Sequence, residues 1–171
     1  APCDIHRVIE IPDCTLEYLH AAIQAAMGWG DHHLHLLEAG DEVYGPRPVD
    51  DDSSIDWRLE ESCLLSDVIE QEAIDELNYI YDMGDRWSHR IEVLSRTPVG
   101  DRPGTPKCLE GKGECPPEDC GGVDGYALWL RRKREGKLVD DEVIPADFDS
   151  AFFDLDAANA DLKKLKWGRF H

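Results

Sequence analysis

Positive charge is scarce in this sequence of 171 residues. Lysine and arginine total 18 against 37 aspartate and glutamate, which gives a formal net charge of −19. The excess is greatest in residues 36–82, where 15 acidic residues stand against two arginines. Because such a chain repels phosphate backbones, we expect direct binding to duplex DNA to be weak or absent, and a basic protein partner suits the charge better. The basic clusters at 131–134 and 163–169 are typical of a solvated helix face and a helix C-terminus.

Long hydrophobic runs are also missing. No stretch approaches the ~20 apolar residues that span a bilayer. The first residues lack the charged-then-apolar order of a secretion signal, so we expect a cytoplasmic protein with no membrane association. In that reducing compartment the six cysteines are expected to be free. A hydrophobic fraction of 42% over this length fits one globular domain spanning residues 1–171.

Recognised catalytic and cofactor motifs are absent as well. The sequence contains no P-loop, GxSxG, HExxH or GxGxxG pattern. Whether the chain is an enzyme is therefore uncertain from sequence. The leading hypothesis is a non-catalytic interaction or ligand-binding module. The alternative is a metal-dependent, hydrolase-like enzyme with its site between a hairpin at 82–89 and a cysteine-containing loop at 108–122.

What is present is a pattern of alternating and helical segments. Alternation and β-branched residues predict strands over 4–11 and 33–38, a short return at 43–44, and a hairpin of 78–81 with 88–94. Helical spacing predicts helices over 15–28, 64–77, 125–134 and 154–165, with Thr15 and Ser66 as N-caps. This β-α-β-β-α-β-β-α-α order predicts a single-domain α+β fold: a mixed, mostly antiparallel sheet with helices packed on it.

Residues 97–124 form the longest segment without periodicity. They contain five of the ten prolines, and we expect an ordered loop because proline lowers the entropy of the unfolded chain. Trp87, Tyr126 and Trp129 are expected to be largely buried and to pack this loop onto the sheet.

Three cysteines on this loop raise the question of a metal. Cys108, Cys115 and Cys120 offer soft ligands for zinc, and His89, Asp85 or Asp119 could complete the shell. Their x6 and x4 spacings are wider than a zinc knuckle, which favours packing of the cysteines as small hydrophobes. Redox pairing of Cys108 with Cys115 is a third alternative.

The best polar cluster is Asp82, Asp85 and His89. A carboxylate that orients a histidine can serve acid–base chemistry or metal ligation. The same residues serve a tight turn equally well, and we favour that structural role. His33 and His35, two residues apart on a strand, share one face, where they either chelate a metal or occupy half-buried positions.

Three blocks of the sequence contain distinctive motifs. Residues 19–35 contain GW followed by HLH, residues 79–89 read YIYDMGDRWSH, and residues 108–126 contain CLEG, CPPEDCGG and GY in that order. In these blocks, spread over residues 5–130, the sequence resembles the plasmid pRiA4b ORF-3-like family, with Met83 where the family usually has Phe. The family is intracellular, is found mostly in prokaryotes and has no characterised function, and the resemblance implies the same for this chain. Some members are labelled resolvase-like through mobile-element neighbourhoods. The residues do not support that activity, because neither serine-rich stretch (Ser53 and Ser54, or Ser62 and Ser66) has the neighbouring arginines with which a serine recombinase holds the scissile phosphate.

Overall fold

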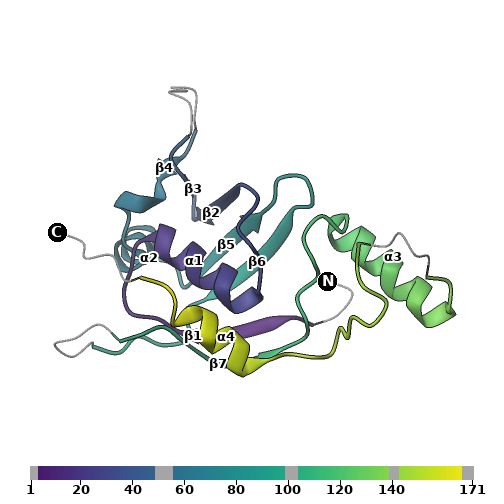
Figure 1. The fold of residues 1–171 in the computed structure, drawn as a ribbon. Coiled ribbons are helices and arrows are strands. Elements are labelled where there is room, and N and C mark those ends of the chain that lie inside the picture. Colours follow the sequence, from purple (N-terminus) through teal and green to yellow (C-terminus); the bar gives the residue numbers. More distant parts are fainter. Residues whose placement is uncertain (1–3, 49–55, 99–103, 139–142, 167–171) are drawn as a thin grey trace.

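The computed structural model describes residues 4–48, 56–98, 104–138 and 143–166. Figure 1 shows the arrangement of its elements. The strands are β1 (His6–Glu10), β2 (His35–Ala39), β3 (Glu42–Gly45), β4 (Arg58–Leu59), β5 (Glu76–Tyr81), β6 (Trp87–Glu92) and β7 (Lys107–Lys112). The helices are α1 (Leu16–Met27), the short 3-10 helix η1 (Glu60–Ser62), α2 (Leu65–Glu72), α3 (Gly122–Glu135) and α4 (Leu155–Leu162).

The strands divide between two sheets. Five strands pair in the order β4-β3-β2-β5-β6, and all of these pairs are antiparallel except β3 with β4. Strands β1 and β7 form a separate antiparallel pair. Helix α1 lies over the larger sheet, and α4 lies beside β1 and β7 (Figure 1). The predicted α+β fold with mostly antiparallel pairing is confirmed, with two sheets where one was expected.

One face of the larger sheet carries the side-chain rings of tyrosine, tryptophan and histidine residues. Tyr81 of β5 is opposite His35 of β2 and Trp87 of β6, and Tyr79 is opposite His89. Because alternate residues of a strand share a face, these five side chains lie on the same side of the sheet. We call this the aromatic face. It packs beneath α1, and Tyr79 and Tyr81 are fully buried there.

Helix α1 follows the sequence pattern closely. The Thr15 hydroxyl accepts from the Tyr18 backbone N–H at 3.3 Å, as predicted for the N-cap, and Gly28 ends the helix with φ 84°. The apolar stripe of α1 is interrupted by two polar residues one turn apart. His20 and Gln24 are both buried against the aromatic face. This position is unusual for side chains that need hydrogen-bond partners.

Helix α2 departs from the prediction at both ends. Leu64 is its N-cap residue and makes no side-chain cap, whereas Ser66 lies inside the helix and donates its hydroxyl to Asp13 Oδ2 at 2.7 Å. The helix ends at Glu72 because Ala73 adopts the left-handed conformation with φ 52°. The last two residues of the predicted helix are therefore the first of strand β5.

The predicted loop 97–124 contains strand β7. It pairs with β1, roughly a hundred residues earlier in the chain, and periodicity within a window cannot detect such a partner. Cys108 of β7 is fully buried in a small core with Ala22, Ala158 and Leu162. Residues 99–103 of the predicted loop lie outside the described ranges.

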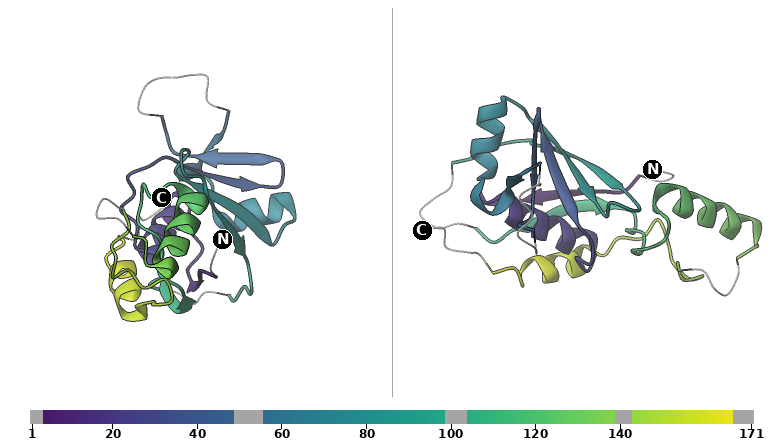
Figure 2. Two further views of the ribbon diagram at one scale, coloured as in Figure 1. Left: turned by 90° about the vertical axis from the view of Figure 1, so that its right-hand side faces the viewer. Right: turned by 90° about the horizontal axis from the view of Figure 1, so that it is seen from above.

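Helix α3 extends away from the sheets at one end of the molecule (Figures 1 and 2). The predicted burial of Trp87, Tyr126 and Trp129 is confirmed. Trp129, however, packs against the segment after α3: its indole N–H donates to the Ile144 carbonyl at 3.1 Å, and its ring meets Phe148 edge-on. The last turn of α3 is basic, which complements the helix dipole. Within the described ranges, every helix is too short or too polar to cross a membrane.

Candidate metal centre beneath helix α1

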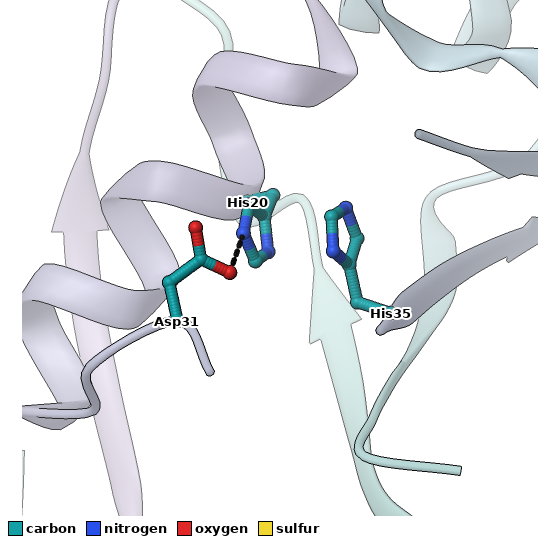
Figure 3. Close-up of side chains that lie close together, drawn as sticks. All are labelled: His20, Asp31 and His35. Atoms are coloured by element: carbon teal, nitrogen blue, oxygen red, sulfur yellow. Dashed lines mark hydrogen bonds and ion pairs between the residues drawn. The ribbon is translucent and has the colours of Figure 1, made fainter. Parts of the chain in front are cut away.

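Two histidines stack inside the core between α1 and the larger sheet. The rings of His20, from α1, and His35, from the start of β2, lie with centroids 3.4 Å apart and planes within 3° (Figure 3). Each residue is only 5% exposed. Asp31, on the connection between α1 and β2, reaches the same place from the solvent side, with its side chain 60% exposed.

Hydrogen bonds around His20 close a ring of four residues. Gln24 Nε2 donates to the Tyr79 hydroxyl at 2.9 Å, and that hydroxyl lies 2.9 Å from His20 Nδ1. His20 Nε2 lies 3.0 Å from Asp31 Oδ1, and the Asp31 backbone N–H donates to Gln24 Oε1 at 3.1 Å. We call these four residues the polar ring. Since the Tyr79 oxygen accepts from Gln24, its own proton serves His20 Nδ1, which places the imidazole proton on Nε2.

Burial and the neighbouring His35 lower the pKa of His20 to about 4, although the carboxylates of Asp31 and Glu60 act in the opposite direction. His20 is therefore a neutral imidazole at pH 7. A neutral imidazole is the form that binds metal ions.

His35 has a carboxylate partner of its own. Its Nε2 lies 2.8 Å from Glu60 Oε2, and the two side chains are 6% and 4% exposed. Glu60 comes from η1. A histidine that ligates a metal usually donates its other ring N–H to a carboxylate or another acceptor, which fixes the ring orientation. Glu60 meets this requirement for His35 and leaves Nδ1 as the ring nitrogen available to an ion.

One ligand atom from each of His20, Asp31 and His35 lies within 4.8 Å of the other two. We call these three residues the buried histidine group. Two imidazoles and one carboxylate are a ligand set that zinc and ferrous iron use, with bonds of about 2.0–2.2 Å for zinc. An imidazole binds an ion in its own plane, so an ion shared by both rings requires them to turn out of their parallel stack.

A second group lies closer to the surface. His33, Asp82 and Asp119 also each offer an atom within 4.8 Å of the others. We call them the loop histidine group. Asp31, Asp82 and Asp119, the carboxylates of the two groups, all have positive φ. The sequence hypothesis paired His33 with His35, but the structure separates them, because His35 contacts Glu60 and His33 faces the two aspartates.

The predicted polar cluster divides into separate contacts. Asp82 Oδ1 accepts from the backbone N–H of Gly84 at 2.8 Å and of Asp85 at 3.3 Å, which is the role of a turn residue. Asp85 Oδ2 accepts from the Gly121 N–H at 3.1 Å. His89 is on the aromatic face, and burial lowers its pKa. The three side chains therefore act at different places.

The predicted cysteine ligands are also spread out. Cys108 donates its thiol to the Glu110 carbonyl at 3.3 Å on β7, whereas His89 belongs to the other sheet. Burial raises the pKa of Cys115 and raises that of Cys120 to about 11. Among the residues that the structure describes, neither converging group of three ligands contains a cysteine or His89. Cys14, Cys63, Cys108, Cys115 and Cys120 are all free.

His20, Asp31 and Glu60 were missed by the sequence interpretation. His20 had a detectable signal, because with Gln24 it places polar atoms on the stripe of α1 that is otherwise apolar. Asp31 and Glu60 had none, since both lie outside the regular helices and strands that periodicity detects.

Comparison with known proteins agrees with the sequence blocks. Residues 2–159 match the family described as Plasmid pRiA4b ORF-3-like protein. Uncharacterized protein y4hQ of Sinorhizobium fredii is 34% identical over 178 aligned residues, which cover 98% of this chain and 89% of that protein. The crystal structure of MM3350 from Methanosarcina mazei Go1, a protein of unknown function, is similar with a TM-score of 0.70 at 29% identity, covering 89% of this chain and 88% of that one. This chain belongs to the plasmid pRiA4b ORF-3-like family.

Proposed function

We propose that this chain is a ligand-binding module whose ligand is a divalent transition-metal ion, held by His20, Asp31 and His35. One observation carries the proposal. Two buried imidazoles from different elements converge with a carboxylate, and each ring has its other nitrogen held by a partner, Tyr79 or Glu60. This is the arrangement that orients metal-binding histidines in other proteins.

The three ligand atoms follow from those partners. His35 binds through Nδ1, because its Nε2 is engaged with Glu60. His20 binds through Nε2, on the side where Asp31 Oδ1 lies 3.0 Å away. Ion binding therefore moves the imidazole proton from Nε2 to Nδ1, and the Tyr79 hydroxyl, which donates to Nδ1 in the ion-free protein, turns to accept from it. Because Asp31 is the exposed member, further coordination positions face solvent on that side, where a small ligand can reach the ion.

The energetics support a functional role for these residues. Two imidazoles and the Glu60 carboxylate occupy space inside a core where apolar side chains of similar volume are often at least as stabilising. Bonds to an ion offset the desolvation of the ligands, and metal binding is then coupled to folding of the α1–β2 region.

The test uses Asp31→Asn. The side chain is exposed and the amide keeps an oxygen to accept from His20 Nε2, so the variant should fold normally. Purified protein is treated with a chelator and titrated with Zn²⁺ and Co²⁺, with dialysis and elemental analysis to count bound ions. We expect the variant to bind one ion fewer per chain than the parent. His6→Gln, at an exposed position, is the matched control and should bind the parental number.

Co²⁺ adds a readout that is specific to the ligands. Visible absorption bands of bound Co²⁺ report nitrogen and oxygen ligation, and His35→Asn should remove the bands of this site. Equal ion counts and equal Co²⁺ spectra for the parent, Asp31→Asn and His35→Asn would rule the proposal out.

A further inference from the structure

We infer that His33, Asp82 and Asp119 form a second cation site, which fastens the loop before α3 to the β5–β6 hairpin. This inference goes beyond the centre at His20 and does not depend on it. The three residues come from three segments that are distant in sequence: the connection into β2, the hairpin turn, and the loop of residues 113–121. A bound ion would connect all three.

The geometry places carboxylates on two sides of the ring. His33 Nδ1 lies 3.7 Å from Asp82 Oδ2, and His33 Nε2 lies 3.4 Å from Asp119 Oδ1. The side chains are 25%, 11% and 73% exposed in the order His33, Asp82, Asp119. The site therefore has a buried floor and an open side, so an ion held there keeps positions for water.

An unpartnered atom points to a ligand here. His33 Nε2 is shielded from solvent and makes no hydrogen bond in the described part of the chain, although Asp119 is close. Buried polar atoms without a partner are rare in folded proteins because leaving them unpaired costs free energy. Asp82 also has a carboxylate oxygen available to an ion, because only Oδ1 accepts the hydrogen bonds of the turn and Oδ2 takes no part in them. An ion would satisfy both atoms.

The loop that carries Asp119 is docked at both ends of the site. The Trp29 indole N–H donates to the Pro116 carbonyl at 2.9 Å, and the Gly121 N–H donates to Asp85 at 3.1 Å. At Gly122, which has φ 64°, a Cβ would lie 2.4 Å from the Asp85 carbonyl oxygen, so the backbones touch. Asp119 is thus held near its ligating position before any ion binds.

One imidazole and two carboxylates suit a divalent ion that accepts both nitrogen and oxygen ligands, such as Mn²⁺ or Zn²⁺. Asp119→Asn is the direct test because the side chain is largely exposed and its loss should not disturb folding. Asp124→Asn, an exposed acidic position on α3, is the matched control. The measurements are the number of Mn²⁺ or Zn²⁺ ions bound at equilibrium and the hydrogen exchange of residues 115–121 with and without the ion.

The expected result is a pattern across four proteins. The parent binds two Zn²⁺ ions, Asp31→Asn and Asp119→Asn bind one each, and the double variant binds none. In the Asp31→Asn background, added ion should slow exchange in residues 115–121 at least tenfold, and Asp119→Asn should abolish that slowing. An unchanged ion count on Asp119→Asn, or equal exchange with and without ion, would overturn this inference whatever Asp31→Asn does. Loss of an ion on Asp119→Asn alone would support it while counting against the centre at His20.

Discussion

The two histidine groups draw on the same five-residue segment but lie in opposite surroundings. Asp31 and His35 belong to the buried histidine group, and His33, between them, belongs to the loop histidine group. Both rings of the buried group are almost fully enclosed and have hydrogen-bond partners inside the fold. In the loop group one ring nitrogen has no hydrogen-bond partner among the described residues, and one carboxylate is largely exposed.

This difference separates two consequences of placing a histidine near carboxylates. In the buried group the protonation state and the hydrogen bonds of the two rings are part of the stability of the fold, because His20 and His35 have almost no access to water as an alternative partner. In the loop group the contact of Asp119 costs less to rearrange, since its side chain is largely exposed and water can replace the lost contact. Changes to the buried group should therefore alter global stability, and changes to the loop group should alter local order.

The largest expected effect is the acid response of the buried group. The pKa of His20 is about 4 in the folded protein, whereas in the unfolded chain the same imidazole has its ordinary value of about 6.5. Between these values the unfolded state binds more protons, so stability falls as the pH falls. The full loss is about 3 kcal/mol, reached near pH 4. Urea unfolding at intervals from pH 7 to pH 4 measures it.

The control for the acid response removes the titrating group. His20→Gln should be less stable than the parent at pH 7 but should lose less stability on acidification through the same range. Asp119→Asn, in the loop group, should not change how steeply the free energy of unfolding falls with pH. If the free energy of unfolding fell equally with pH in the parent and in His20→Gln, the proton uptake that destabilises the fold would belong to a group other than His20.

A smaller effect is expected from Tyr79→Phe, which opens the polar ring. Loss of the hydroxyl leaves His20 Nδ1 and Gln24 Nε2 without their partner, at a cost of about 2 kcal/mol. Tyr44→Phe is a matched control, because Tyr44 is equally buried and its hydroxyl has no hydrogen-bond partner among the described residues. Urea midpoints should fall for Tyr79→Phe and should stay level or rise for Tyr44→Phe, since that change removes a buried hydroxyl without a partner. Equal shifts in the two variants would mean that the polar ring contributes nothing beyond packing.

Elements with strong local signals could be predicted from the sequence, and elements defined by distant partners could not. Helix α1 has a capping Thr15, a terminating Gly28 and a regular apolar stripe, and the β5–β6 hairpin has a turn between alternating runs. Strand β7 exists because β1 pairs with it, and that information is absent from any short window of residues.

The candidate sites divide along the same line. His33, Asp82 and Asp119 were each singled out by residue type, but nothing in their spacing showed that they share one point in space. His20 has the period of a core residue, so its role emerges only when Asp31 and Tyr79 are seen to hold both of its nitrogens. The cysteines gave a stronger pattern than either histidine group, although Cys108 packs in a separate core on β7.

The smallest effect is expected at Glu118, beside the loop group. Its carboxylate accepts from the Gly30 N–H at 3.1 Å and from the Tyr81 hydroxyl, and His32 Nδ1 lies 3.3 Å away. Burial opposes ionisation of Glu118, but these hydrogen bonds and His32 outweigh it and keep its pKa below the usual value. The contact therefore persists at neutral pH and weakens only as the pH falls below the range in which an ordinary glutamate titrates.

Glu118→Gln keeps the shape of the side chain but removes its charge and one acceptor, so we expect a loss of about 1 kcal/mol. The loss should be local, since Glu118 joins the loop to the segment that carries Asp31 and His33. Hydrogen exchange at Gly30 should quicken several-fold, while exchange in α1 stays unchanged. Glu110→Gln, exposed on β7, should alter neither. Faster exchange throughout α1 in Glu118→Gln would mean that loop and core are one cooperative unit, and the contrast between the two histidine groups would then not extend to their stability.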